Sequence, residues 1–379
     1  MRIAPFSVAL SCFALCSAPA LAADLTKTAP KELAKKVTAA REKGLDWLTK
    51  NQATNGSWGK DHSIAVTSFA CLAYLSASEE PFVGERGKAL VKGLHFLLAQ
   101  QKDGTFADQK DDRSRWVYGQ GFGTLALSET YGRLLFCKTK PDLDAKRIRA
   151  VVAQAVKVIG KNQSTSGGWW YEPGFPQLHE GSTTVCVVQA VVSAANQGID
   201  IDQKVLDKGF EYLRQCQTKE GGFNYMLGDG QNMKEGTAAG IATLGLMKQF
   251  DTQVMIKGYQ FLLKITPAGI SAGQFPYYGH FYGCMGMYLL GQEFKEAKEY
   301  REKTGAYIAG VQQELLASQQ EDGSWPLKGW LKNARSENSG YSTAFATLAL
   351  FVPEARLSIY QRTPPKLPAE AKPAKQAWR

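Results

Sequence analysis

The amino-acid sequence predicts an all-α fold, an (α/α)6 toroid of six helical hairpins with an inner and an outer ring of helices. Two observations predict it. One corner motif, Gln-x3-Gly-x-Trp or Phe, occurs five times with the same internal spacing. Six pairs of helical segments, each an amphipathic segment followed by an almost uncharged one, cover most of the chain. Self-similarity of this kind is typical of repeat architectures.

Residues 1–22 have the pattern of an export signal rather than of a folded element. Arg2 supplies a short positive region, residues 4–18 are mostly apolar, and Ala20-Leu21-Ala22 offers a cleavage site of small residues. The apolar run is too short to span a bilayer as a stable helix. We therefore expect a protein that is exported to the periplasm or the extracellular space through a cleaved signal peptide, with an uncleaved N-terminal anchor as the alternative.

The first segment of each pair has apolar residues at helical spacing and charged residues on the other face. These segments are 44–52, 93–101, 155–163, 209–217, 258–265 and 311–319. The second segments are rich in small residues and nearly without charge, which predicts helices that are buried on most sides. They are 67–75, 121–132, 184–192, 238–247, 283–291 and 343–351.

These two kinds of helix fit a closed ring, because an inner barrel needs helices that are apolar all round. Neither end of the array has a polar capping repeat, which also favours closure. We expect a lead-in at residues 23–40, the toroid at 41–353 and a disordered Pro-, Lys- and Ala-rich tail at 354–379.

Each corner follows an amphipathic helix, and its Gly is expected to end that helix. The five copies are Gln52-Gly56-Trp58, Gln100-Gly104-Phe106, Gln163-Gly167-Trp169, Gln217-Gly221-Phe223 and Gln319-Gly323-Trp325. The Gln amide can satisfy backbone groups at a helix end, and the aromatic ring can pack between outer helices. The fifth pair departs from the pattern, because residues 265–275 contain Pro267 and have no Gln at the position of the corner motif.

The repeated corner resembles the repeat of the terpenoid cyclase and protein prenyltransferase superfamily, which includes the squalene–hopene cyclases. The resemblance covers roughly residues 40–352. The D-x-D-D acid that the resemblance would imply for alkene protonation is absent, since neither Asp111-Asp112 nor Asp200-Ile201-Asp202 matches it. The zinc set of Asp, Cys and His in the prenyltransferases cannot be placed either. We therefore expect no metal and no cofactor.

Cysteine content and charge exclude further classes of protein. Five cysteines follow the expected cleavage site, an odd number without a CxxC pair, so neither a disulfide framework nor a zinc finger is indicated. Cys71, Cys186 and Cys284 lie in apolar segments and are expected in the core. The net charge is +10, but no nucleic-acid-binding signature accompanies it, and we expect no nucleic-acid partner.

The residues that lead into the inner helices predict a site at one mouth of the ring. Aligning the repeats on their Gly and Thr positions places His62, Arg115, His179, Lys234 and Asn338 at one equivalent position, with His280 one step displaced. The functional interpretation is a polar-rimmed, aromatic-lined pocket for a ligand with an anionic or hydroxylated head. The alternative is that these residues only cap and solubilise the helix starts. The expected ligand-binding residues are His62, Arg115, Trp116, Tyr118, His179, Lys234, Glu235, Tyr278, His280, Tyr282 and Tyr341.

The favoured function is binding of an apolar or amphiphilic small molecule, with a polyisoprenoid as one option, or of a protein partner, without a complete catalytic motif. The enzyme alternatives are prenyl or terpenoid processing and a glycan-active toroid. The candidate catalytic residues are His179, Glu180 and Asp112. For the glycan alternative, Asp112 and Glu180 should face each other at roughly 5–10 Å.

Overall fold

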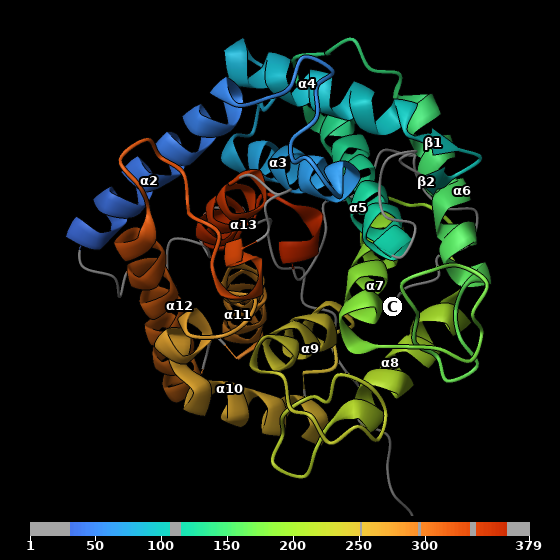
Figure 1. Ribbon diagram of the computed structural model, residues 1–379, viewed down its shortest axis with the longest axis vertical. Helices are drawn as coiled ribbons and strands as arrows, with labels where there is room; N and C mark the ends of the chain where they lie inside the picture. The colour runs from blue at the N-terminus through green and yellow to red at the C-terminus, as the bar shows by residue number, and fades with distance from the viewer. Residues whose placement is uncertain (1–30, 107–114, 251, 295–296, 334–338, 362–379) are drawn as a thin grey trace, which may run out of the picture.

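A computed structural model describes residues 31–106, 115–250, 252–294, 297–333 and 339–361. Within these ranges the chain forms two concentric rings of helices (Figure 1). The outer ring consists of α2 (Lys31–Lys50), α4 (Gly84–Ala99), α6 (Ala145–Lys161), α8 (Gln203–Cys216), α10 (Gln253–Ser271) and α12 (Lys298–Ser318). The inner ring consists of α3 (Ser63–Ala77), α5 (Trp116–Phe136), α7 (Gly181–Asn196), α9 (Lys234–Leu246), α11 (Pro276–Glu293) and α13 (Gly340–Phe351). The predicted α/α toroid of six hairpins is confirmed.

The short elements lie in the connections. Strands β1 (Gln101–Lys102) and β2 (Thr105–Phe106) form an antiparallel hairpin at the second corner. The 3-10 turns are η2 (Gly329–Asn333), before α13, and η3 (Val352–Glu354) and η4 (Ser358–Tyr360), after it.

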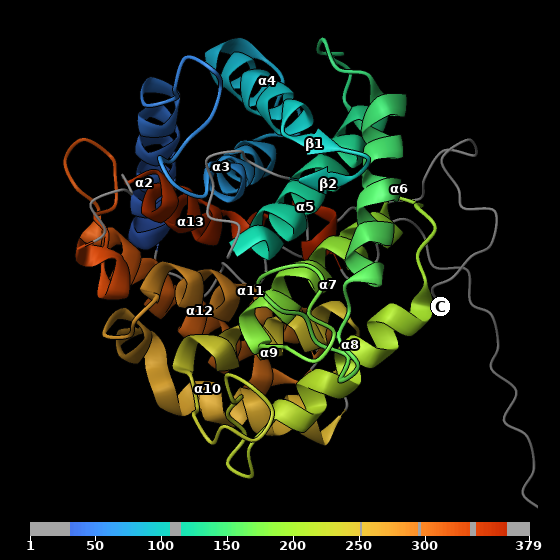
Figure 2. The ribbon, with the colours of Figure 1, turned by 45° about the vertical axis from the view of Figure 1, so that its right-hand side comes forward.

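The inner ring is closed. Each inner helix packs against the next one along the chain, and the last, α13, packs against the first, α3. Figure 2 shows α13 beside α3 from a second direction. In the outer ring α12 also contacts α2. The inner helices are buried on nearly every side, as their uncharged sequences predict.

The corner glutamines join each repeat to the next outer helix. The amide nitrogen of Gln52 donates to Gly56 O at 2.9 Å, within its own corner, and to Ala89 O of α4 at 2.8 Å. Gln319 does the same with Gly323 O and with Ala40 O of α2, at 3.0 and 2.9 Å. The last corner therefore makes on the first helix the contact that Gln52, Gln163 and Gln217 make on the next outer helix, which closes the ring with hydrogen bonds.

The aromatic residue of the corner packs where the next outer helix has a glycine. The ring of Trp325 lies against Gly44 of α2, and the ring of Trp58 lies against Gly93 of α4. Trp325 is fully buried, and its indole nitrogen donates to Leu315 O at 2.8 Å. A side chain on Gly44 or Gly93 would overlap the indole, so these two glycines are needed for space.

The second corner uses a different glutamine. Here the side chain of Gln120, in α5, donates to Gly104 O at 2.9 Å and accepts from Phe106 N at 3.0 Å. In the Trp325 corner the second of these bonds is made by a threonine of the inner helix, Thr343. At the second corner the side-chain amide of Gln120 therefore makes the hydrogen bonds that a corner glutamine and an inner-helix threonine make elsewhere. Gln100 stands at the motif position but does not make them.

The fifth hairpin differs, as its sequence predicts. Instead of a Gly corner, α10 breaks at Thr266, whose φ of 62° lies outside the helical region, and then continues through one more helical stretch starting at Pro267. Pro267 has no backbone N–H to give, and the residue before a proline is disfavoured in the helical region. The broken helix carries the chain over to α11.

The folded part extends beyond the boundaries that the sequence predicts. Helix α2 begins at Lys31, so half of the expected lead-in belongs to the outer ring. Residues 354–361, expected in the disordered tail, pack onto the inner helices. Glu129 of α5 accepts from Ser358 Oγ and Ser358 N, both at 2.7 Å, and Tyr360 is fully buried. The expected signal peptide, residues 1–22, lies outside the described residues. None of the described helices is long and apolar enough to cross a membrane.

Candidate functional site

A cavity of about 830 Å³ opens at the end of the ring where the inner helices begin. All six inner helices contribute to its wall through their first turns or the residue just before them, for example His62 before α3, Ser182 in α7 and Tyr341 in α13. The partial positive charge of a helix lies at its N-terminus, so six of these ends converge on one space. The fold alone therefore favours negative charge at this mouth.

Three basic side chains rim the cavity. His62 precedes α3 in the left-handed conformation, with φ of 52°, Arg115 precedes α5, and Lys234 is the first residue of α9. Arg115 and Lys234 are exposed and His62 is half-buried. The guanidinium of Arg115 lies over the ring of Tyr171, 4.1 Å from its centroid. This cation–π contact holds the charge at the rim.

Hydroxyl groups form a network on the α5–α7 side of the cavity. Tyr118 and Ser182 are hydrogen-bonded through their hydroxyls at 2.8 Å, and Ser182 Oγ donates to Glu180 Oε1 at 2.7 Å. Tyr171 and Tyr225, both in the wall, also share a hydrogen bond. Burial raises the pKa of Tyr118, and the nearby Glu180 raises it further. Tyr118 therefore stays a neutral phenol that can donate or accept.

Aromatic and aliphatic side chains line the deeper part of the cavity. Phe69, Phe122 and Phe345 come from the second turns of three neighbouring inner helices, and Phe69 contacts both of the others, with ring centroids 4.3 and 3.9 Å away. Val185 and Ala239 continue this surface on α7 and α9. A charged rim thus leads into an apolar throat, which suits a ligand with one polar end.

One carboxylate lies in this wall. Glu235, in the first turn of α9, is 4% exposed, and its Oε1 accepts a hydrogen bond from Phe275 N at 2.9 Å. It is the one acidic side chain among the described residues that line the cavity. Of the expected ligand-binding residues, His62, Arg115, Tyr118, Lys234, Glu235, Tyr278 and Tyr341 all line this cavity.

Two of the expected histidines lie elsewhere. His179 precedes the capping residue of α7, and its Nδ1 is 3.1 Å from the hydroxyl of Tyr212 in the outer helix α8. His280 is buried, and its Nε2 is hydrogen-bonded at 2.9 Å to Ser271 Oγ. Burial and the charge of Lys328 lower the pKa of His280 to about 3, so it is neutral at any physiological pH. Neither histidine belongs to the rim.

Trp116 and Tyr282, also expected at the site, are not among the residues of its wall. Trp116 is half-buried at the start of α5, and Tyr282 is fully buried within the inner ring. A helix turns by about 100° per residue, so a position shifted by one or two residues points a side chain away from the shared cavity.

Glu180 has a structural role. It caps α7, because Oε1 accepts from Thr183 N at 2.6 Å and Oε2 accepts from Ser182 N at 2.7 Å. Burial raises its pKa, although these hydrogen bonds lower it. With no exposed surface and with both oxygens occupied, it does not face a ligand. Asp112, the other member of the predicted carboxylate pair, lies outside the described residues.

The cysteines of the described residues lie in the protein interior. All five in the described ranges are free and buried, as the sequence predicts for Cys71, Cys186 and Cys284. Burial raises the pKa of Cys284 to about 12, so its thiol stays protonated. Among the described residues no group of three or more His, Cys, Asp or Glu side chains could hold a metal ion.

Several residues of the cavity wall were missed by sequence reasoning. They are the aromatic residues of the throat, the hydroxyl pair on the α7 side and part of the loop before α13: Phe69, Phe122, Phe223, Phe345, Ser182, Tyr225 and Leu331. An aromatic residue in the second turn of three inner helices was the signal that could have found the throat. Tyr225 and Leu331 lie in connections of irregular length, for which repeat alignment gives no equivalent position.

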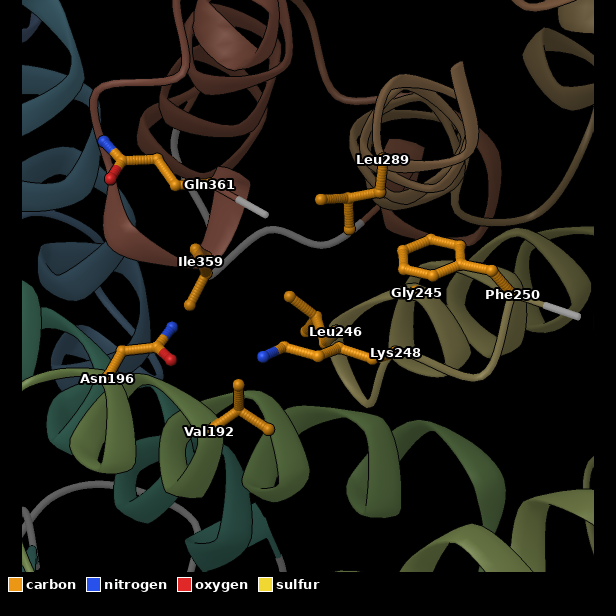
Figure 3. Close-up of a pocket in the computed structure, with 9 residues that line it drawn as sticks. All are labelled: Val192, Asn196, Gly245, Leu246, Lys248, Phe250, Leu289, Ile359 and Gln361. Carbon is orange, nitrogen blue, oxygen red and sulfur yellow. The ribbon is translucent and has the colours of Figure 1, made fainter. Parts of the chain in front are cut away.

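Residues that follow α13 pack against the opposite end of the inner ring. Figure 3 shows a small pocket between the C-terminal ends of α7, α9 and α11, where Ile359 lies among Val192, Leu246 and Leu289. Its volume, about 20 Å³, suffices for roughly one water molecule. Residues 354–361, which include Ile359, are held there by hydrogen bonds from Ser358 to Glu129. The large cavity therefore opens at the mouth formed by the helix N-termini.

The fold and cavity define a toroid with a ligand-sized space between its inner helices. The chain belongs to the prenyltransferase alpha-alpha toroid domain family, whose model matches residues 4–224, 183–265 and 260–365. No curated protein matches the sequence.

Solved structures of the same fold include enzymes of two kinds. The type II terpene cyclase MstE from Scytonema, in complex with geranylgeranyl dihydroxybenzoate, has a TM-score of 0.54 and 12% identity over 86% of this chain and 100% of that one. An inactive alpha-1,6-mannanase of Salegentibacter sp. in complex with alpha-1,6-mannotetrose has a TM-score of 0.59 and 11% identity over 83% and 99%. A protein from Actinoplanes has a TM-score of 0.53 and 13% identity over 84% and 99%. At these identities the likeness shows the fold.

Proposed function

We propose that this protein is exported and binds an amphiphilic small molecule in the axial cavity. The head group, anionic or hydroxylated, lies at the rim, and the apolar chain lies in the throat. The observation that carries this proposal is the cavity itself: about 830 Å³, basic at its rim and aromatic below it. Cavities that take small organic ligands span roughly 300–1,000 Å³ and combine apolar walls with a few polar groups.

The polarity of the site supports this orientation of the ligand. Arg115 and Lys234 are exposed at the rim, where an anionic head can reach both and remain in contact with water. The six helix N-termini add to the favourable potential for an anion. Below the rim, Phe69, Phe122 and Phe345 offer apolar surface whose removal from water by a hydrocarbon chain stabilises the complex by roughly 25 cal/mol per Å².

A polyisoprenoid chain is one option for the apolar part. MstE holds geranylgeranyl dihydroxybenzoate in the same fold, so a toroid of this kind can accommodate a prenyl chain with a polar head. We propose binding rather than acid-initiated cyclisation, because the D-x-D-D motif is absent from this sequence and Glu180 is committed to capping α7.

Native mass spectrometry of the protein purified from its own cell envelope tests the proposal. We expect a protein that starts near Ala23 and carries a stoichiometric amphiphile. In the double variant Arg115→Gln with Lys234→Gln the bound fraction should fall, and the fold should not change. A matched control, Lys157→Gln with Lys264→Gln, neutralises two exposed lysines on the outer helices and should retain the ligand.

Three results would contradict the proposal. A protein that is always recovered empty, and that binds no added amphiphile, would show that the cavity is not a ligand site. Equal retention of the ligand by the mouth variant and the outer-helix control would show that the basic rim does not hold the head group. An intact N-terminus on protein recovered from the cytoplasm would contradict export.

A further inference from the structure

Glu235 has the one buried carboxylate among the described residues of the cavity wall. Oε1 accepts one hydrogen bond, from Phe275 N at 2.9 Å. A carboxylate has about four lone-pair sites, so most of its capacity is unused. Within the described residues no Lys, Arg or His nitrogen lies within 4.0 Å of it, the distance of an ion pair. A charge removed from water without a partner is costly.

The surroundings hold this carboxylate in place. Glycines at 273 and 279 pass directly against it: a Cβ at Gly273 would overlap Oε1, and a Cβ at Gly279 would lie 2.9 Å from its Cγ. Its backbone is fixed in the first turn of α9, and the hydrogen bond from Phe275 fixes its tip. The side chain therefore cannot swing out to the solvent without losing these contacts.

We propose that the ligand's head group is zwitterionic, with an organic ammonium beside Glu235 and an anionic group beside Arg115 and Lys234. This inference rests on the proposed function and specifies its ligand. The ammonium would supply the counter-charge that Glu235 lacks. Phe275 and Tyr278, which adjoin Glu235 in the wall, offer aromatic faces of the kind that bind ammonium groups.

Burial gives the order of the two charges along the ligand. Glu235 is 4% exposed, whereas Arg115 and Lys234 are exposed. The ammonium should therefore lie closer to the apolar chain and the anion should lie outermost. A betaine has this order, chain, then ammonium, then carboxylate. A phosphocholine ester has the reverse order.

Isothermal titration of the whole folded chain with four compounds, each below its micellar concentration, tests this inference. The compounds are dodecyl betaine, tetradecanoate, dodecylphosphocholine and dodecyl maltoside. We expect dodecyl betaine to bind about tenfold more tightly than tetradecanoate, because its quaternary ammonium, which has no N–H to donate, pairs in charge with Glu235 and contacts the neighbouring aromatic faces. Glu235→Gln should remove this preference, because the amide can still accept from Phe275 N but carries no charge. The control Glu299→Gln, on the outer surface, should retain it.

The outcomes separate this inference from the function on which it rests. Equal affinity of the wild type for dodecyl betaine and tetradecanoate would refute the zwitterionic head group. A preference for dodecyl betaine that survives in Glu235→Gln would refute it as well. Neither result would contradict amphiphile binding in the cavity. If dodecyl maltoside binds most tightly, Glu235 accepts hydrogen bonds from ligand hydroxyls, and the zwitterionic head group is refuted. If dodecylphosphocholine binds more tightly than dodecyl betaine, the proposed order of charges, with the ammonium closer to the apolar chain than the anion, is wrong. Failure of all four compounds to bind overturns the proposed function itself. The wild-type comparison needs no variant, so it decides even if Glu235→Gln does not fold.

Discussion

Replacing Trp325 by Ala should weaken the closure of the ring. The side chain is fully buried, its indole nitrogen donates to Leu315 O of α12 at 2.8 Å, and its ring rests on Gly44 of α2. Its backbone N–H donates to Thr343 of α13 at 3.1 Å. One residue therefore joins the last hairpin to the first helix, and truncation leaves a cavity at that junction.

The magnitude follows from the area of the side chain. A buried tryptophan removes about 150–250 Å² from water, which corresponds to about 4–6 kcal/mol at 25 cal/mol per Å². Measured truncations of this type cost about 3–5 kcal/mol, and we adopt that range for the loss in free energy of unfolding. With an unfolding entropy of about 2.1 cal/mol/K per residue and about 300 ordered residues, the melting temperature should fall by about 5–8 °C.

Differential scanning calorimetry measures this shift, and Trp330 supplies the matched control. Trp330 is 71% exposed and stacks on Phe275 at the mouth, so Trp330→Ala removes the same atoms from a solvated position. We expect the control to change stability by no more than about 0.5 kcal/mol, as surface substitutions usually do. A Trp325→Ala melting temperature within a degree of the wild type would refute the packing role of the corner tryptophan.

Three further outcomes are expected. Gln120→Ala should lower the free energy of unfolding, measured in urea, by about 1–3 kcal/mol, because it leaves the buried N–H of Phe106 without a partner. Gln100→Ala should lower it less. The reverse order would contradict the role of Gln120 at the second corner. Anionic amphiphiles should bind more weakly as the salt concentration rises, because salt screens the exposed charges of Arg115 and Lys234; an affinity that does not change with salt would exclude the basic rim. Burial raises the pKa of Glu129, so its carboxyl contributes stability that is present below its unfolded pKa and is lost as the pH rises through its folded pKa. The difference in free energy of unfolding between the wild type and Glu129→Gln, measured in urea, should therefore shrink from about pH 4 to 7. A difference that grows over this range would contradict the raised pKa.

The repeat pattern was sufficient to predict the architecture, because most of the hairpins have the same corner with the same packing requirements. The glycine of the corner needs a positive φ, 92° at both Gly56 and Gly323, and the aromatic residue needs a gap in the next helix. These demands leave a fixed spacing in the sequence. Gln120 shows the limit of this reasoning, since an amide from another helix can satisfy the same backbone groups and leave the motif residue Gln100 without its role.

The candidate site was only partly predictable from the same alignment. Equivalent positions located His62, Arg115 and Lys234 at the rim, because each stands at the start of an inner helix whose N-terminus faces the cavity. His179 and His280 were misplaced. The first lies one residue before the cap of α7, and the second lies in the second turn of α11, so both turn toward outer helices. A one-residue error in register is harmless for helix prediction and decisive for side-chain direction.

The direction of the inner helices explains why this mouth suits charged ligands and why Glu235 stands out. Six parallel helices present their positive ends to one space, and Arg115 and Lys234 add full charges, so an anion is favoured by the fold and by the rim together. A carboxylate in the first turn of α9 gains from the same field, which lowers the cost of its burial. That field does not supply the counter-charge that Glu235 lacks. A ligand that brings an ammonium satisfies Glu235 and leaves the rim free for its anion, whereas a simple anion would place two negative charges in one cavity.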